Sequence, residues 1–161
     1  MSFENDEFFN WDSTPEITFT TDPLAKYPYA NCSQCPLLAF PCVGSYVPQG
    51  TIELIAIGEA PGFYEVQNNK PFVGPSGKLL DAALEHIGID PTTVYRTNAV
   101  LCRPPNNDIS KYPTAVQACG KRLEAELAAI ECDTIVALGN TAVTALDAIA
   151  ERYHANNPTY K

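Results

Sequence analysis

A glycine-bounded turn follows the first strongly apolar segment of the chain, and it restricts the fold more than any other stretch. Residues 52–57 are mostly apolar and rich in isoleucine, as expected of a buried strand. Residues 58–62, Gly-Glu-Ala-Pro-Gly, follow directly and place an acid between two glycines. In open α/β sheets, ligands bind at the carboxyl ends of strands, and glycine lets the backbone approach a ligand closely. The stretch therefore predicts a binding site at this turn.

An aromatic residue and a helix follow the turn. Phe72 lies between Pro71 and Gly74, which favour a loop, and a helix is expected to begin near Pro75 and to stop at Gly88. One face of this helix carries its apolar residues, which are Leu79, Leu80, Ala83, Leu84 and Ile87. An acid and an aromatic ring are therefore expected at the mouth of a sheet, as in a pocket for a small molecule or a base.

The strand–turn–helix pattern occurs twice more. Further strands are expected at 94–100 and 134–138, with a helix at about 113–130 between them. The order β-α-β-α-β predicts an α/β fold with a mainly parallel sheet of three to four strands and helices on both faces. Glu59, Asn98 and residues 139–141 then fall at the carboxyl ends of their strands and converge on one edge.

Composition fits a single globular domain with an acidic tail. The chain has 161 residues, 45% of them apolar, and a net charge of −9. Residues 1–25 contain six acids and no Lys or Arg, so residues 26–161 carry a net charge of only −3. Nucleic-acid binders are usually basic, and the acidic total charge argues less strongly against that class because most of it lies in the tail. We expect 1–25 to be a flexible tail, or alternatively a docking segment anchored by Phe8, Phe9 and Trp11. No run is long enough to span a membrane and no signal peptide is apparent, which favours a cytoplasmic protein.

Six cysteines without a secretory signal favour metal binding or buried thiols over disulfides. Four of them form the pattern C-x2-C-x66-C-x16-C: Cys32, Cys35, Cys102 and Cys119. One close pair with two distant singles is compatible with an iron–sulfur cluster, a zinc ion or free thiols. Cys132 resembles a buried apolar residue that opens a strand. Cys42 lies in a loop and would be a ligand only if Cys35 is not.

Several motifs, in order, resemble those of family 4 uracil-DNA glycosylases. They are Gly-Glu-Ala-Pro-Gly at 58–62, Glu65, Pro-Phe-Val-Gly at 71–74, Gly-Lys-Leu-Leu at 77–80, Thr-Asn-Ala-Val-Leu-Cys-Arg-Pro-Pro at 97–105 and Val-Ala-Leu-Gly-Asn-Thr-Ala at 136–142. The resemblance covers about residues 32–146. It implies the fold of these enzymes and hydrolysis of the N-glycosidic bond of uracil in DNA, as in base excision repair.

The resemblance assigns roles to particular residues. Asn98 would read the uracil edge with its amide, which both accepts and donates hydrogen bonds. Phe72 would stack on the flipped base, and Glu59 would position the attacking water and favour the cationic sugar. The substrate-binding set is then Glu59, Ala60, Pro61, Glu65, Phe72 and Asn98. The four cysteines of the pattern, Cys32, Cys35, Cys102 and Cys119, would hold a [4Fe–4S] cluster. Asn98 as a strand cap and Glu65 as a solvated loop acid are the plainer alternatives.

One motif of the family has no counterpart. The family carries a His-Pro-Ser-like turn about 40 to 50 residues beyond the 138–139 segment, with basic residues nearby, whereas this chain has only His86 and His154. Neither histidine stands at the corresponding place, so we expect the carboxyl-terminal part of the domain to be absent. The chain is then either part of a split or truncated glycosylase, which a second chain would complete, or a catalytically silent iron–sulfur module that binds DNA or a partner. A phosphate-binding loop is disfavoured because the turn has an acid and no lysine.

Overall fold

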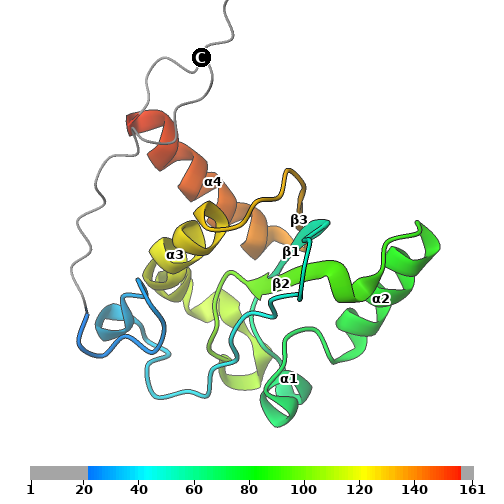
Figure 1. Ribbon diagram of the computed structural model, residues 1–161. Helices are drawn as coiled ribbons and strands as arrows, with labels where there is room; N and C mark the ends of the chain where they lie inside the picture. Colours follow the sequence, from blue (N-terminus) through cyan, green and yellow to red (C-terminus); the bar gives the residue numbers. More distant parts are fainter. Residues whose placement is uncertain (1–21, 157–161) are drawn as a thin grey trace, which may run out of the picture.

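The computed structural model describes residues 22–156, which form a three-stranded sheet with helices on both sides (Figure 1). The docking anchors expected at Phe8, Phe9 and Trp11, and most of the acidic tail, lie outside this range. The strands are β1 (Leu54–Gly58), β2 (Val94–Asn98) and β3 (Ile135–Ala137). Their positions confirm the three strands expected from the sequence.

The sheet is parallel and its strand order is β2-β1-β3. In the register, Gly58 lies opposite Asn98 on one side of β1, and Ile57 lies opposite Ala137 on the other. The carboxyl ends of all three strands therefore meet at one edge of the sheet, as the sequence predicted. The central strand β1 and the edge strand β2 are fully buried, whereas the other edge strand, β3, is partly exposed.

Four α-helices are present in the described range. They are α1 (Phe63–Asn68), α2 (Pro75–His86), α3 (Pro113–Ala128) and α4 (Asn140–Asn156). Short 3-10 turns lie at Cys32–Gln34, Pro91–Thr93, Pro105–Asn107 and Ile109–Lys111. Pro75 and Pro113 occupy the first turn of α2 and α3, where the missing N–H has no partner in a helix anyway.

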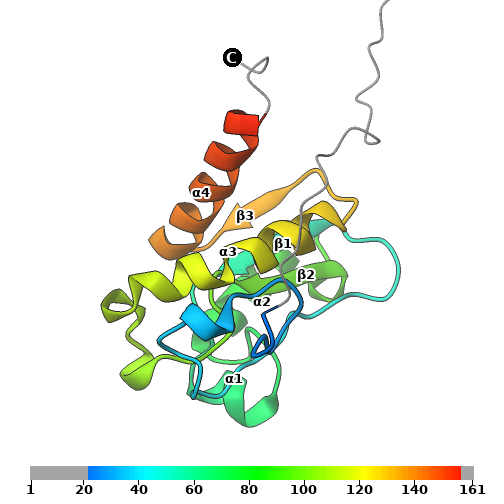
Figure 2. The same cartoon turned by 90° about the vertical axis from the view of Figure 1, so that its left-hand side faces the viewer.

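The helices divide between the two faces of the sheet. On one face, α3 and α4 cover β1 and β2 through a core cluster that includes Ile55, Ile57, Leu123 and Ala142 (Figure 2). On the other face, Leu84 of α2 packs with Leu54, Ala56 and Val94. This arrangement confirms the predicted α/β fold with helices on both faces.

The apolar stripe of α2 is only partly used for this packing. Leu84 is buried, but Leu79 is 73% exposed and Ile87 is 68% exposed. Leu79, together with Leu80 and Ala83, instead lines a cavity at the carboxyl edge of the sheet. An apolar stripe on a helix can thus mark a cavity wall as well as a core contact.

The two outer edges of the sheet differ. Along β2, the backbone of Tyr46 exchanges two hydrogen bonds with Arg96, of 2.8 and 3.1 Å, so this edge is covered by an antiparallel bridge. Along β3, no second strand pairs with the outer edge within residues 22–156, and Ile135 is 43% exposed. Unpaired edges are ready templates for strand addition.

Arg122 on α3 is the largest fully buried side chain of the described range. Its Nη2 donates to the carbonyl oxygens of Asn98 (2.7 Å) and Ala99 (3.1 Å), and its Nη1 contacts Thr97 and Glu126. The carboxylate of Glu126 also accepts hydrogen bonds from Ser45, Thr97 and Tyr95. One buried guanidinium therefore joins α3 to the carboxyl end of β2.

In the part of the chain that the structure describes, no helix combines the length and the apolar character needed to cross a lipid bilayer.

We predict that Arg122→Met lowers the free energy of unfolding by about 3–5 kcal/mol, because it leaves Glu126 and two carbonyl groups without their buried cation. The measurement is urea unfolding followed by circular dichroism. Arg152→Met is the matched control, because Arg152 pairs with Glu124 near the surface, and such pairs contribute about 0–1 kcal/mol. Equal effects of the two substitutions would contradict the role given to Arg122.

Candidate functional site

A cavity of about 730 Å³ opens at the carboxyl edge of the sheet. Its walls come from the turn at 58–62, the start of α1, the loop before α2, α2 itself and the end of β2. The structure brings together here the six residues predicted to bind the substrate, although their roles remain predictions. Five of the six, Glu59, Ala60, Pro61, Phe72 and Asn98, meet around the end of β1, and Glu65 lies behind the neighbouring loop.

Gly58 permits close contacts at the end of β1. A Cβ atom at this position would lie 2.5 Å from Oδ1 of Asn98 and 2.7 Å from Cζ of Phe72, both too close for real atoms. The amide of Asn98 and the ring of Phe72 therefore share the space that a side chain at position 58 would fill. The glycine noted in the sequence is required by this close approach rather than by its backbone angles.

Asn98 ends β2 and is 5% exposed. Its main chain is fixed by pairing with Gly58 and by the hydrogen bond from Arg122 to its carbonyl oxygen. Its side-chain amide lines the cavity and makes no hydrogen bond to another residue in the range 22–156. An amide that faces a cavity without a protein partner retains both its donors and its acceptor for a ligand.

Phe72 has a left-handed backbone conformation, with φ of 57°. The following helix holds this loop closely, since a Cβ atom at Gly77 would lie only 2.0 Å from the carbonyl oxygen of Phe72. The loop predicted from Pro71 and Gly74 is therefore present, and it directs the ring of Phe72 to the end of β1.

Glu65 connects the turn after β1 to the loop before α2. Its Oε1 accepts hydrogen bonds from the backbone N–H groups of Val73 (3.1 Å) and Gly74 (2.7 Å), and its Oε2 accepts from Gly62 (3.1 Å). The carboxylate is therefore engaged by main-chain donors. This geometry indicates an acid that holds the walls of the cavity in place and differs from a solvated loop carboxylate.

Glu59 is exposed and lines the cavity. Its Oε2 accepts a hydrogen bond of 2.5 Å from Oγ1 of Thr141, in the first turn of α4. The positive end of the helix dipole favours a carboxylate at this place. The convergence of strand ends expected from the topology thus joins Glu59 to the segment at 139–141.

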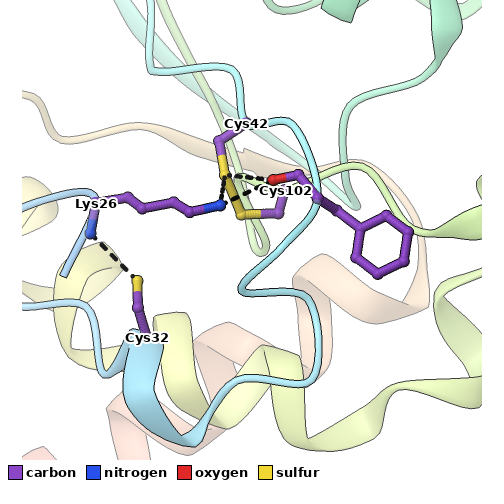
Figure 3. The surroundings of a disulfide bond; sticks show 5 residues. Lys26, Cys32, Cys42 and Cys102 are labelled. Carbon is purple, nitrogen blue, oxygen red and sulfur yellow. Dashed lines mark hydrogen bonds between the residues drawn. A yellow bond between two sulfur atoms is a disulfide. The ribbon is translucent and has the colours of Figure 1, made fainter. Parts of the chain in front are cut away.

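The cysteines are arranged differently from the expectation. Cys42 and Cys102 form a disulfide, so the prediction that the cysteines avoid disulfides is wrong for this pair (Figure 3). The cause is a short antiparallel bridge, in which the bonds from Val43 to Leu101 and from Arg103 to Pro41 place the two cysteines opposite each other. The Sγ of Cys102 is therefore bonded to the Sγ of Cys42 and is not a free thiolate ligand in this structure.

The other three cysteines of the pattern lie in the same region. Cys32 and Cys119 are buried and Cys35 is half-buried, beside the apolar cluster that contains Cys102. Burial raises the pKa of the Cys35 thiol, and negative charge on Cys119 and Cys32 raises it further. Lys26 links the region, because its backbone N–H donates to Sγ of Cys32 (3.4 Å) and its Nζ contacts Sγ of Cys42 (3.5 Å) (Figure 3).

Thiolates are suitable ligands for a soft metal centre, but the positions of these thiols in the structure do not form a metal site. Neighbouring thiolates repel one another when ionised, and a bound cation would relieve that repulsion. Within residues 22–156, however, no three His, Cys, Asp or Glu side chains are arranged to hold a metal ion. A four-thiolate set would require Cys102 to be released from Cys42.

The histidines lie away from the cavity. His86 is in the last turn of α2 and His154 is near the end of α4, and both are exposed. Neither lines the cavity. The expectation that neither stands at the place of the catalytic turn of the family is consistent with these positions.

Two residues that support the site were not predicted from the sequence. Thr141 was noted only as part of a segment, although a hydroxyl at the start of a helix is a common partner for a nearby acid. Arg122 shares a helix face with Ala115, Ala118, Cys119 and Leu123, so a charge within an apolar stripe was the available signal.

Comparison with known proteins gives the family. The uracil DNA glycosylase superfamily matches residues 45–159. The type-4 uracil-DNA glycosylase of Archaeoglobus fulgidus is 41% identical over 115 residues, which are 70% of this chain and 56% of that protein. Those of Thermotoga maritima (40% over 115 residues) and Pyrobaculum aerophilum (38% over 119) are covered to 59% of their length.

The chain spans less than three fifths of the length of these curated relatives. The matched region nevertheless contains the whole sheet, all four helices up to the end of the described range, and every residue of the cavity. The chain therefore belongs to the uracil DNA glycosylase superfamily, with type-4 uracil-DNA glycosylases among its relatives.

Proposed function

We propose that this protein excises uracil from DNA by hydrolysing the N-glycosidic bond, as a DNA repair glycosylase. The observation that carries the proposal is the amide of Asn98, which has no hydrogen-bond partner among residues 22–156 and faces the cavity beside the ring of Phe72. Uracil offers an acceptor at O4 and a donor at N3, and one oriented amide complements both. Cytosine has the opposite pattern at these positions. The cavity therefore has the means to distinguish the two bases.

The base would leave the stack to enter the cavity. Extrusion from a duplex costs a few kcal/mol and less from single strands. Phe72 would supply a stacking surface, which contributes roughly 1–3 kcal/mol per base in proteins that bind single strands. Because the loop of Phe72 is held by Glu65 and Gly77, the surface would need little rearrangement.

Glu59 is the group that would act on the sugar. Cleavage of the bond develops positive charge on the deoxyribose and negative charge on the leaving uracil. An ionised carboxylate at the cavity mouth would favour the cationic sugar and orient a water molecule. The hydroxyl of Thr141 would keep the carboxylate in place through its hydrogen bond to Oε2.

We propose a [4Fe–4S] cluster as the cofactor, as the resemblance to family 4 glycosylases implies, with Cys32, Cys35, Cys102 and Cys119 as its ligands. Four thiolates are the usual ligand set of such clusters. The cluster would carry charge and tie the segment at 32–35 to α3. The positions of the thiols in one buried region support this assignment, which requires Cys102 to be reduced.

A second candidate function is a catalytically silent iron–sulfur module that binds DNA or a partner protein. The observation in its favour is that neither His86 nor His154 lies at the cavity. Uracil release from a uracil-containing oligonucleotide separates the two candidates, because the second requires DNA or partner binding without base release.

The first prediction concerns Asn98. Asn98→Asp replaces the donor with a group that repels O4, so uracil release should fall by about 1–3 kcal/mol of transition-state stabilisation, or about 5- to 150-fold. The measurement is single-turnover release from a uracil-containing single strand. Asn69→Asp makes the same change at an exposed residue outside the cavity and should release uracil at the wild-type rate. Equal rates for Asn98→Asp and wild type would show that Asn98 is structural.

The second prediction concerns the metal. Protein purified without oxygen should be brown and contain about four iron atoms per chain. Alanine at Cys32, Cys35, Cys102 or Cys119 should each reduce the iron content, as measured by a colorimetric iron assay and visible absorption. Cys132→Ala and Cys42→Ala should retain iron, and the latter also removes the competing partner of Cys102. Zinc in place of iron, or iron in all four alanine variants, would overturn the assignment.

The third prediction concerns completeness. The open outer edge of β3 and the exposed Ile135 are suited to accept a further strand. A segment supplied in trans that contains a strand, a His-Pro-Ser-like turn and basic residues should therefore raise the melting temperature, because it binds only the folded form. It should also increase uracil release. Full activity of the 161-residue chain alone, with no response to the segment, would contradict this prediction.

A further inference from the structure

Two exposed aromatic side chains stand at the rim of the cavity. Phe63 and Tyr64 open α1 and are 47% and 53% exposed. Both line the same cavity as Asn98 and Phe72. Their rings contact each other edge to face, with centroids 5.6 Å apart and planes at 76°. Exposed aromatic surface gathered beside a cavity is typical of a ligand-binding site.

The position of this pair is fixed by the same contacts that shape the cavity. Gly62 is the N-cap of α1, and its backbone N–H donates to Glu65 in a capping box. Glu65 also binds the N–H groups of Val73 and Gly74. The first turn of α1 is therefore tied to the loop that carries Phe72. The rings therefore stand on an element that is held in place by the hydrogen bonds of Glu65.

A cation accompanies the aromatic pair. The guanidinium carbon of Arg103 lies 5.4 Å from the centre of the Phe63 ring, and Nε of Arg103 donates to Oδ1 of Asn107 (2.7 Å). Its two Nη groups make no hydrogen bond or ion pair to any other residue between 22 and 156. A guanidinium with free Nη groups is suited to bind a phosphate through two parallel hydrogen bonds.

We propose that Phe63, Tyr64 and Arg103 form a stacking platform for the nucleotide adjacent to the one whose base enters the cavity. This inference rests on the proposed function of the cavity. The rings would stack on the neighbouring base, and Arg103 would bind its phosphate. Exposed rings alone would also suit an apolar protein surface, but a guanidinium that lies against one ring, and whose Nη groups have no partner among residues 22–156, favours a ligand that combines a flat apolar face with an anion. A nucleotide has both features.

The platform also specifies the form of the DNA. In an intact duplex, each base is stacked on both sides, and a face becomes available only after a neighbouring base is extruded at a cost of a few kcal/mol. A base in a single strand or beside an unpaired site has a free face, and aromatic side chains bind such bases with little regard to sequence. The substrate class is therefore single-stranded DNA, or DNA that is locally unpaired next to the uracil.

The test measures binding by fluorescence anisotropy, with proteins and probes compared at the same salt concentration and with a salt series for the wild type and Arg103→Ala, because binding to DNA depends strongly on salt. The probes are a labelled single strand with one deoxyuridine, its duplex, and the same strand with an abasic analogue on the 5′ or the 3′ side of the deoxyuridine. The wild-type protein should bind the single strand more tightly than the duplex. One of the two abasic strands should bind about tenfold more weakly, because it lacks the base that stacks on the platform.

The variants separate the roles of the residues. Phe63→Ala and Tyr64→Ala should each weaken binding to the intact single strand by about tenfold and remove the effect of the abasic neighbour. Phe63→Tyr keeps a ring and should retain most of the affinity. Arg103→Ala should weaken binding and reduce its salt dependence, because one phosphate contact is lost. Tyr153→Ala, at an aromatic residue of α4 that is 42% exposed and does not line the cavity, should bind as wild type.

The outcomes distinguish the platform from the proposed catalytic function. Loss of binding in Phe63→Ala and Tyr64→Ala, with unchanged melting temperatures, supports the platform even if no uracil is released. The platform is overturned if Phe63→Ala and Tyr64→Ala release uracil at the wild-type rate and the wild-type protein binds both abasic strands as tightly as the intact strand. That result leaves the catalytic function standing. Equal or tighter binding of the duplex by the wild-type protein also overturns it.

Discussion

The missing side chain of Gly58 is the constraint on which the candidate site depends. It lets the amide of Asn98 and the ring of Phe72 approach the end of β1 from two sides, one carried by the neighbouring strand and one by a loop. Any Cβ at this position would displace one of the two. The parallel register fixes the position of Asn98, and the hydrogen bonds to Glu65 fix the loop that carries Phe72. Two independent parts of the fold therefore meet in the space left by the absent side chain of Gly58.

The strands and the main helices were predictable because their signals are local. Apolar runs followed by glycine or asparagine turns placed all three strands, and proline marked the first turns of α2 and α3. The parallel topology then placed Glu59 and Asn98 at one edge without further information. The short helix α1 was not predicted, because six residues give too little periodicity for a pattern to emerge.

The remaining features depend on contacts between distant segments, which a single sequence does not contain. The pairing of Cys42 with Cys102 follows from an antiparallel bridge between segments 60 residues apart. The burial of Arg122 follows from the way α3 crosses the end of β2. The sequence could not show that part of the apolar face of α2 lines a cavity and does not pack in the core. Both kinds of face have the same residue spacing and differ only in what lies opposite them.

The left-handed backbone of Phe72 has a consequence for the energetics of the cavity. A residue with a Cβ in this conformation is less stable by roughly 1–2 kcal/mol than in an ordinary one, and here the surrounding contacts impose it before any ligand arrives. The cost of ordering this loop is therefore met during folding, and it does not reduce the affinity for a ligand. Glycine at position 72 would relieve the strain, but it would also remove the ring that packs at the end of β1 and leave a more mobile cavity wall.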